Sequence, residues 1–171
     1  IPGVLVADGI NILADLHAAG GEPGDAEPGD AEPGDAEPAT ADLAGRWVLA
    51  PHAGELARLA GLSSREVLAD GFGVTGRVAR ELNAVVVLKS HVTIIAAPDG
   101  RLGVVDGMNP ALGTGGSGDV LAGIIAGFLA RGSHPYEAAA AGCVAHAEVG
   151  RRTGAARGLF LAEDLLERVS E

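Results

Sequence analysis

A glycine-rich run offers the clearest opportunity for chemistry in this sequence. It reads Gly-Thr-Gly-Gly-Ser-Gly-Asp over residues 113–119, and an apolar stretch over residues 120–130 follows it directly. Glycine lets the backbone turn tightly and approach a ligand closely, and the apolar stretch is typical of a buried helix. Free amides and the positive end of a helix dipole then meet at one point. The run therefore predicts an anion site suited to phosphate.

Asp119 stands where this loop enters the predicted helix. A carboxylate beside a bound phosphate repels the ligand, so its presence needs a reason. One reason is chemical, because Asp119 can take the proton from a hydroxyl group that attacks the phosphate. The other is structural, because aspartate is a favoured helix cap and suits the positive end of the dipole. The loop by itself leaves both interpretations open.

Three further polar residues follow apolar runs. Lys89 ends a strand pattern, where an ammonium group is costly unless it meets an anion; a lysine that extends to solvent is the alternative. His52 lies between Pro51 and Gly54 in a restricted turn, and by itself it is more typical of a structural turn residue than of a ligand-binding one. Glu55 suits the first turn of a helix, where acidic side chains are favoured.

Histidine and cysteine give no pattern that indicates a metal. His17, His134 and His146 show no metal-ligand spacing with one another or with Cys143, so no metal-ligating residues are predicted. The single cysteine lies among small apolar residues, which predicts a buried, inert thiol. That pattern fits a reducing, cytoplasmic compartment.

The rest of the sequence alternates short apolar runs with helical patterns. Buried parallel strands are predicted at residues 4–7, 47–50 and 84–88, and helices at residues 56–60, 76–82, 120–130, 136–151 and 161–169. This alternation is typical of an α/β fold in which a mostly parallel sheet has helices on both faces. Pro-Asp-Gly at residues 98–100 is turn chemistry, so an antiparallel hairpin is predicted from residues 92–96 and 102–105.

Loops that follow parallel strands meet at one edge of such a sheet, and ligands bind there. The loops in question are residues 8–11, 51–55 and 89–93. We expect these three loops and the glycine-rich run to share one rim.

The composition narrows the classes of function. The chain has 171 residues, the length of one domain, and 47% of them are apolar. A net charge of −11 and an aromatic content of 3% disfavour nucleic acid and anionic membranes as partners. No signal peptide is recognised, and the longest apolar run is too short to span a bilayer.

An acidic repeat with a period of five residues occupies positions 22–38. It holds seven carboxylates, without which the net charge of −11 becomes −4. Proline and glycine punctuate every repeat and nothing in it can enter a core, which predicts a disordered surface insertion. The fixed ligand spacing of a calcium loop is absent. We therefore expect a single domain over residues 1–171 that carries this insertion.

Four motifs together resemble the ADP/ATP-dependent NAD(P)H-hydrate dehydratases, a branch of the ribokinase-like superfamily. They are Asp-Gly-Ile-Asn at residues 8–11, Leu-Ala-Pro-His-Ala-Gly-Glu at 49–55, Leu-Lys-Ser-His-Val-Thr at 88–93, and Asn-Pro-Ala-Leu-Gly-Thr-Gly-Gly-Ser-Gly-Asp-Val-Leu-Ala-Gly at 109–123. The last block is highly specific, and the Pro-His-x-Gly-Glu block stands at the right distance from it. The resemblance covers almost the whole chain apart from the repeat.

The resemblance implies a ribokinase-like fold and a lyase that repairs hydrated NADH or NADPH with ADP or ATP. It implies that Asp119 deprotonates the ring hydroxyl for attack on the terminal phosphate, after which phosphate is eliminated. His52 and Asp119 match positions that contact the hydrated dinucleotide. The residues that match the nucleotide site are Lys89, Ser90, His91, Val92, Thr93, Gly115, Gly116, Ser117 and Gly118. The resemblance further implies Mg²⁺ with the nucleotide, a cytoplasmic location, homo-oligomers in some members and fusion to an NAD(P)H-hydrate epimerase domain in others.

The sequence also departs from the family pattern. Val6 stands where aspartate is common, Ala53 where proline is common and Ser90 where glycine is common. The long N-terminal section of the family domain is missing here, so we expect a partial domain.

Two alternatives stay open: a ribokinase-like small-molecule kinase of the thiazole or pyrimidine type, and a catalytically inactive nucleotide-binding fragment. The motif at residues 51–55 favours the dehydratase over the kinase, while intact Lys89 and Asp119 argue against the inactive fragment.

Overall fold

A five-stranded sheet in the order β1-β2-β3-β4-β5 organises the computed structural model, which describes residues 1–19, 42–107 and 109–169. The strands β1, β2 and β3 are parallel, β4 is antiparallel to β3, and β5 is antiparallel to β4. Four strands therefore share one direction, as predicted. The strands are β1 (Gly3–Leu5), β2 (Trp47–Leu49), β3 (Val85–Leu88), β4 (Val92–Ala96) and β5 (Leu102–Asp106).

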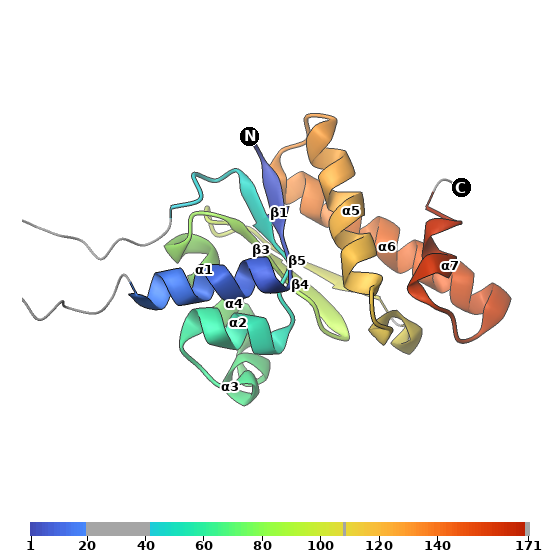
Figure 1. Cartoon of the computed structure of the whole chain (residues 1–171), viewed down its shortest axis with the longest axis horizontal. Coiled ribbons are helices and arrows are strands. Elements are labelled where there is room, and N and C mark those ends of the chain that lie inside the picture. The colour runs from blue at the N-terminus through green and yellow to red at the C-terminus, as the bar shows by residue number, and fades with distance from the viewer. Residues whose placement is uncertain (20–41, 108, 170–171) are drawn as a thin grey trace, which may run out of the picture.

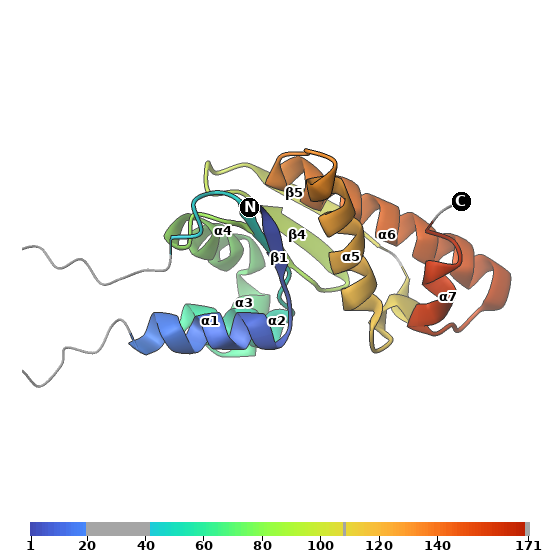
Figure 2. The same cartoon turned by 45° about the horizontal axis from the view of Figure 1, so that its top comes forward.

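Helices cover both faces of this sheet, as the alternating pattern predicted (Figure 1). On one face lie α1 (Asp8–Ala19), α2 (Ala53–Ala60), α3 (Ser64–Ala69) and α4 (Gly71–Glu81). On the other lie α5 (Ser117–Ala130) and α6 (Pro135–Arg157), which pack side by side in both views (Figure 2). A short 3₁₀ helix, η1 (Pro110–Gly113), precedes α5, and α7 (Ala162–Leu166) packs against α5 and α6.

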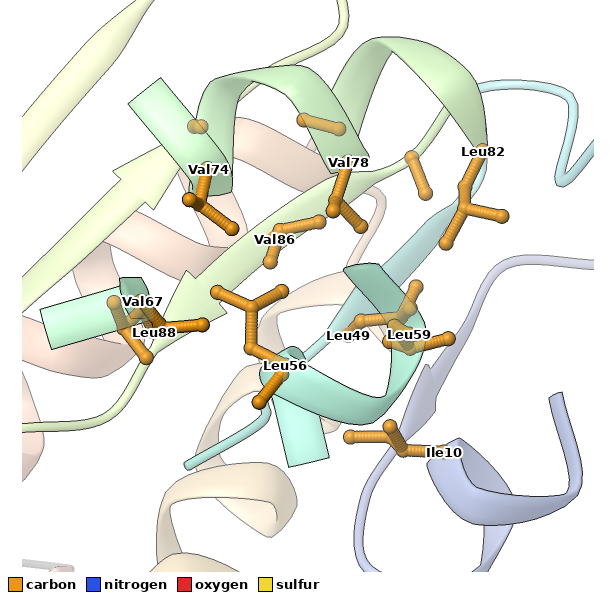
Figure 3. Close-up of a cluster of buried hydrophobic side chains, with 14 of the residues drawn as sticks. Ile10, Leu49, Leu56, Leu59, Val67, Val74, Val78, Leu82, Val86 and Leu88 are labelled. Atoms are coloured by element: carbon orange, nitrogen blue, oxygen red, sulfur yellow. The ribbon is translucent and has the colours of Figure 1, made fainter. Parts of the chain in front are cut away.

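The side chains of β3 alternate between two hydrophobic cores. Val86 and Leu88 point to the core under α2 and α4, while Val85 and Val87 point to the core under α5 and α6. Successive strand residues face opposite sides of a sheet, so a strand covered on both sides must be apolar throughout. Figure 3 shows the first core, in which Leu56 of α2 lies between the sheet and the surrounding helices.

Several details differ from the sequence predictions. The helix α3 was not predicted, and α4 begins at Gly71 and not at residue 76. Residues 8–11 are not a loop, because α1 begins at Asp8 and buries Ile10 against the sheet. The strand β1 is half-buried and not fully buried, because it lies at an edge of the described sheet. The closing helix is shorter than predicted and ends at Leu166. The acidic repeat at residues 22–38 lies outside the described residues.

In the described ranges, no helix is both long enough and apolar enough to cross a bilayer.

Candidate functional site at the carboxyl ends of β2 and β3

The pairing of β2 with β3 continues past both strands and brings two predicted site residues side by side. His52 and Lys89 form an isolated parallel bridge, and the Lys89 amide donates to the Pro51 carbonyl at 2.8 Å. Both residues follow the carboxyl end of a parallel strand, which is where ligands bind in open α/β sheets. The loops at residues 51–55 and 89–93 therefore share one rim, as predicted.

His52 is the N-cap of α2. Its Nδ1 accepts hydrogen bonds from the amides of Gly54, at 3.0 Å, and Glu55, at 3.2 Å. A neutral imidazole whose Nδ1 accepts must carry its proton on Nε2. The His52 side chain is 61% exposed at the rim, and its Nε2 faces the Glu55 carboxylate. The structural role expected of a turn histidine is thus observed.

Glu55 connects His52 with Lys89, a role that the sequence analysis missed. Its Oε2 accepts a hydrogen bond from the His52 amide at 2.7 Å and lies 4.0 Å from the Lys89 Nζ, while Oε1 lies 3.4 Å from the His52 Nε2. The Glu55 side chain is only 9% exposed. A buried carboxylate requires such partners. The first contact completes a capping box between His52 and Glu55, and only the fold could show that Lys89 approaches the same carboxylate.

The Lys89 ammonium reaches from the sheet to the beginning of α5. Its Nζ lies 3.2 Å from the point that a Cβ atom would occupy on Gly118. A side chain at position 118 would therefore press on the ammonium. The structure thus brings Lys89 of one predicted motif against Gly118 of another, and the space between them is open because residue 118 is glycine.

The glycine loop, residues 113–119, leaves backbone donors available at the same end of α5. Gly116 caps the helix with a positive φ of 87°, and no side chain caps it. Within the described ranges, the amides of Gly115, Gly116 and Gly118 donate to no backbone carbonyl. Unpaired amides at a helix N-terminus, together with the helix dipole, favour an anion.

Asp119 occupies the third position of α5 with an exposed side chain. In the part of the chain that the structure describes, its carboxylate makes no hydrogen bond and no ion pair. A capping role would show a hydrogen bond from the side chain to a backbone amide. Asp119 therefore stands at the loop, and no capping hydrogen bond of its carboxylate is observed among the described residues.

The remaining predicted nucleotide-site residues follow Lys89 in the turn that enters β4. Ser90 Oγ lies 3.2 Å from the Nδ1 of His91, and Val92 and Thr93 are the first residues of the strand. Ser117, the first residue of α5, is buried, and its hydroxyl donates to the Leu112 carbonyl. Ser117 therefore holds the loop in shape, while the side of Gly118 that lacks a side chain faces Lys89.

Cys143 lies outside this rim, in the core between α6 and the sheet. Burial raises the pKa of its thiol to about 12, so the group stays protonated at neutral pH. A protonated, buried thiol is a poor nucleophile. The prediction of an inert cysteine is confirmed.

Comparison with known protein families gives a match over residues 33–171 to the family described as NAD(P)H-hydrate dehydratase. The bifunctional NAD(P)H-hydrate repair enzyme Nnr of Moorella thermoacetica is 42% identical over 125 residues, which is 72% of this chain and 24% of that protein. The ADP-dependent (S)-NAD(P)H-hydrate dehydratase of Xanthomonas campestris pv. campestris is 42% identical over 127 residues, which is 73% of this chain and 44% of that protein. The chain thus spans less than half the length of these relatives.

Solved structures agree with this similarity. The crystal structure of the ADP/ATP-dependent NAD(P)H-hydrate dehydratase from Bacillus subtilis, co-crystallised with ATP and Mg²⁺, superposes with a TM-score of 0.65 at 32% identity. The match covers 72% of this chain and 47% of that one. A ribokinase-like superfamily protein from Enterococcus faecalis superposes with a TM-score of 0.70 at 28% identity, over 97% of this chain and 50% of the other. The predicted ribokinase-like fold is confirmed.

Proposed function

Because the chain belongs to the NAD(P)H-hydrate dehydratase family, we propose that it forms the nucleotide-binding part of the active site of such an enzyme. In the proposed reaction, hydrated NADH or NADPH loses water at the expense of ADP or ATP. The observation that carries this proposal is the approach of the Lys89 Nζ to within 3.2 Å of the position that a Cβ atom would occupy on Gly118, at the N-terminus of α5. A cation, free amides and a helix dipole meet there, and their common ligand is a nucleotide phosphate.

In this proposal, the terminal phosphate of the nucleotide binds between Lys89 and the amides of the glycine loop. These donors are already in place, so they stabilise the charge on the transferring phosphoryl group without reorganisation. Residues 90–93 lie in the turn next to Lys89 and are proposed to contact the rest of the nucleotide. ADP is supported as the phosphoryl donor by the similarity to the ADP-dependent Xanthomonas relative, and ATP by the nucleotide in the Bacillus crystals.

Asp119 is proposed as the general base. It takes the proton of the hydroxyl group on the hydrated nicotinamide ring, and the alkoxide oxygen then attacks the terminal phosphorus. The bond from that phosphorus to the bridging oxygen breaks, and AMP leaves when ADP is the donor. The phosphorylated ring then loses phosphate and a proton from the neighbouring carbon, which restores the dihydronicotinamide. His52, whose exposed side chain lies at the rim, is proposed to contact the hydrated dinucleotide.

Magnesium fits this site only as an ion that accompanies the nucleotide. Among the described residues, no group of three His, Cys, Asp or Glu side chains could hold a metal ion. Mg²⁺ keeps several water molecules and typically binds through one or two carboxylates and substrate phosphates, so the phosphates of ADP or ATP would hold it. When bound, it would neutralise phosphate charge. The crystals of the Bacillus relative grew with ATP and Mg²⁺, which supports this proposal.

The decisive experiment is a turnover assay on hydrated NADH with ADP and with ATP, using this chain and, separately, its complete reading frame. Return of dihydronicotinamide absorbance together with release of AMP or ADP would support the proposal. Nucleotide binding without turnover in the complete reading frame would favour an inactive nucleotide-binding module. Accumulation of a phosphorylated alcohol would favour a small-molecule kinase. The bifunctional relatives make fusion to a second enzyme domain a further point to check in that reading frame.

A further inference from the structure

The helix α6 contributes no residue to the predicted site, yet it packs directly under the segment that leads into the glycine loop. Both views show the segment before α5 close to α6 (Figures 1 and 2), and η1 contacts α6. Three residues spaced four apart on α6 meet this segment: His146, Gly150 and Gly154. Residues four apart share one face of a helix.

Gly150 is buried and receives the Leu112 side chain. A Cβ atom on Gly150 would lie 2.6, 2.8 and 2.9 Å from three carbon atoms of Leu112, which is closer than real contacts allow. The Gly150 carbonyl also accepts a hydrogen bond from the Asn109 Nδ2 at 2.6 Å, and the Asn109 Oδ1 accepts one from the Ala111 amide at 3.0 Å. A side chain at position 150 would therefore force the Leu112 side chain to move from its place on α6.

His146 holds the other end of the loop. Its side chain is buried, and its ring lies next to the backbone of Ser117, the first residue of α5, which acts to raise its pKa. Among the described residues, Nε2 is buried without a partner, so Nδ1 is the nitrogen that faces Ser117. A neutral ring that donates from Nδ1 keeps only a lone pair on Nε2, which costs less to bury unpaired than an N–H group does. Burial lowers the pKa of His146, which favours that neutral ring.

We infer that α6 sets the conformation of the glycine loop, with Gly150 and His146 as positioning residues for phosphate binding. The inference rests on the proposed function, since it takes the loop as the phosphate site. Leu112 links the two contacts, because its side chain seats on Gly150 and its carbonyl accepts the Ser117 hydroxyl. A displacement of Leu112 therefore moves Ser117. The amides of Gly115, Gly116 and Gly118, which flank Ser117 in the loop, move with it.

The test compares Gly150→Ala with Gly127→Ala. Gly127 lies on the exposed side of α5, where an added Cβ atom meets nothing within 4 Å. Both changes favour the helix by removing a flexible residue. We expect Gly150→Ala to weaken ADP binding about tenfold by calorimetry, the loss of one charged hydrogen bond, and to speed amide hydrogen exchange at residues 115–120. Gly127→Ala should change neither quantity. Leu112→Ala added to Gly150→Ala should restore slow exchange, because it removes the overlap.

A second pair of variants tests His146. Asparagine carries its amide nitrogen near the position of the ring Nδ1 and can donate to Ser117, whereas leucine cannot. His146→Leu should therefore speed exchange at the loop and weaken ADP binding, and His146→Asn should recover most of both. Unchanged loop exchange and ADP affinity in folded Gly150→Ala and His146→Leu would overturn the inference. If the unmodified protein does not bind ADP, the proposed function fails, while loop exchange in the free protein still decides the role of α6.

Discussion

Replacing Lys89 with methionine separates the charge of this side chain from its packing. Methionine keeps an apolar stem of similar length and removes only the ammonium group. A lysine that donates a charged hydrogen bond to phosphate contributes about 1.5–3 kcal/mol to binding. Lys89→Met should therefore raise the Kd for ADP roughly ten- to 150-fold, measured by isothermal titration calorimetry.

The same change has a predictable effect on stability through Glu55. At the 4.0 Å that separates the Lys89 Nζ from the Glu55 Oε2, the Coulomb attraction is at most about 4 kcal/mol at an effective dielectric constant of 20. Lys89 is a quarter exposed and Glu55 keeps its hydrogen bond from the His52 amide, so solvent screening leaves about 1 kcal/mol or less. We expect a small fall in the free energy of unfolding, measured by urea denaturation.

A double-mutant cycle with Glu55→Gln isolates the pair. If the two charges stabilise each other, Lys89→Met should lower the free energy of unfolding by less in the Glu55→Gln background than in the unmodified protein. The binding loss should persist in that background, because it arises from phosphate and not from Glu55. An unchanged Kd for ADP in a folded Lys89→Met protein would refute the assignment and leave Lys89 as a side chain that only extends towards solvent.

Other predictions follow from particular contacts. Gly118→Ala should weaken ADP binding with little change in melting temperature, because the new Cβ would lie 3.2 Å from the mobile Lys89 Nζ; a matched calorimetric and thermal comparison tests this. Leu56→Ala should cost about 2–5 kcal/mol in urea unfolding, since Leu56 is fully buried. Burial lowers the pKa of His146 below its ordinary value of 6.5, so as the pH drops the imidazole takes up a proton in the unfolded chain before it does so in the folded protein. The free energy of unfolding should therefore fall as the pH drops from about 7 to 5.5. His146→Asn, which does not titrate, should flatten that fall.

The sequence predicted the strands and most helices because their signals are local. The apolar run of β3 between residues 85 and 88 is unambiguous, since both faces of the strand are covered. The helix α1 was missed because Asp8-Gly9 suggests a turn, although Ile10, Leu13 and Ala14 have helical spacing. Those residues pack in the core beside α2, a tertiary contact that local spacing does not show.

The site shows the same division between local and tertiary information. The phosphate-binding character of the glycine loop follows from its composition, and the end of an apolar strand marks Lys89 as unusual. The role of Glu55 could not be predicted, because its approach to Lys89 depends on the register between β2 and β3. The contacts of Gly150 and His146 depend on how α6 packs, and one sequence carries no signal for them.

The role of Asp119 as general base is tested most directly by turnover of hydrated NADH in Asp119→Asn, made in the complete reading frame. Asparagine keeps the size of the side chain but cannot accept the proton. Turnover should fall on the order of a hundredfold or more, while ADP binds equally well or more tightly because one negative charge near the phosphates is gone. Turnover close to that of the unmodified enzyme, measured on the same preparation whose ADP affinity and melting temperature are normal, would contradict the assignment.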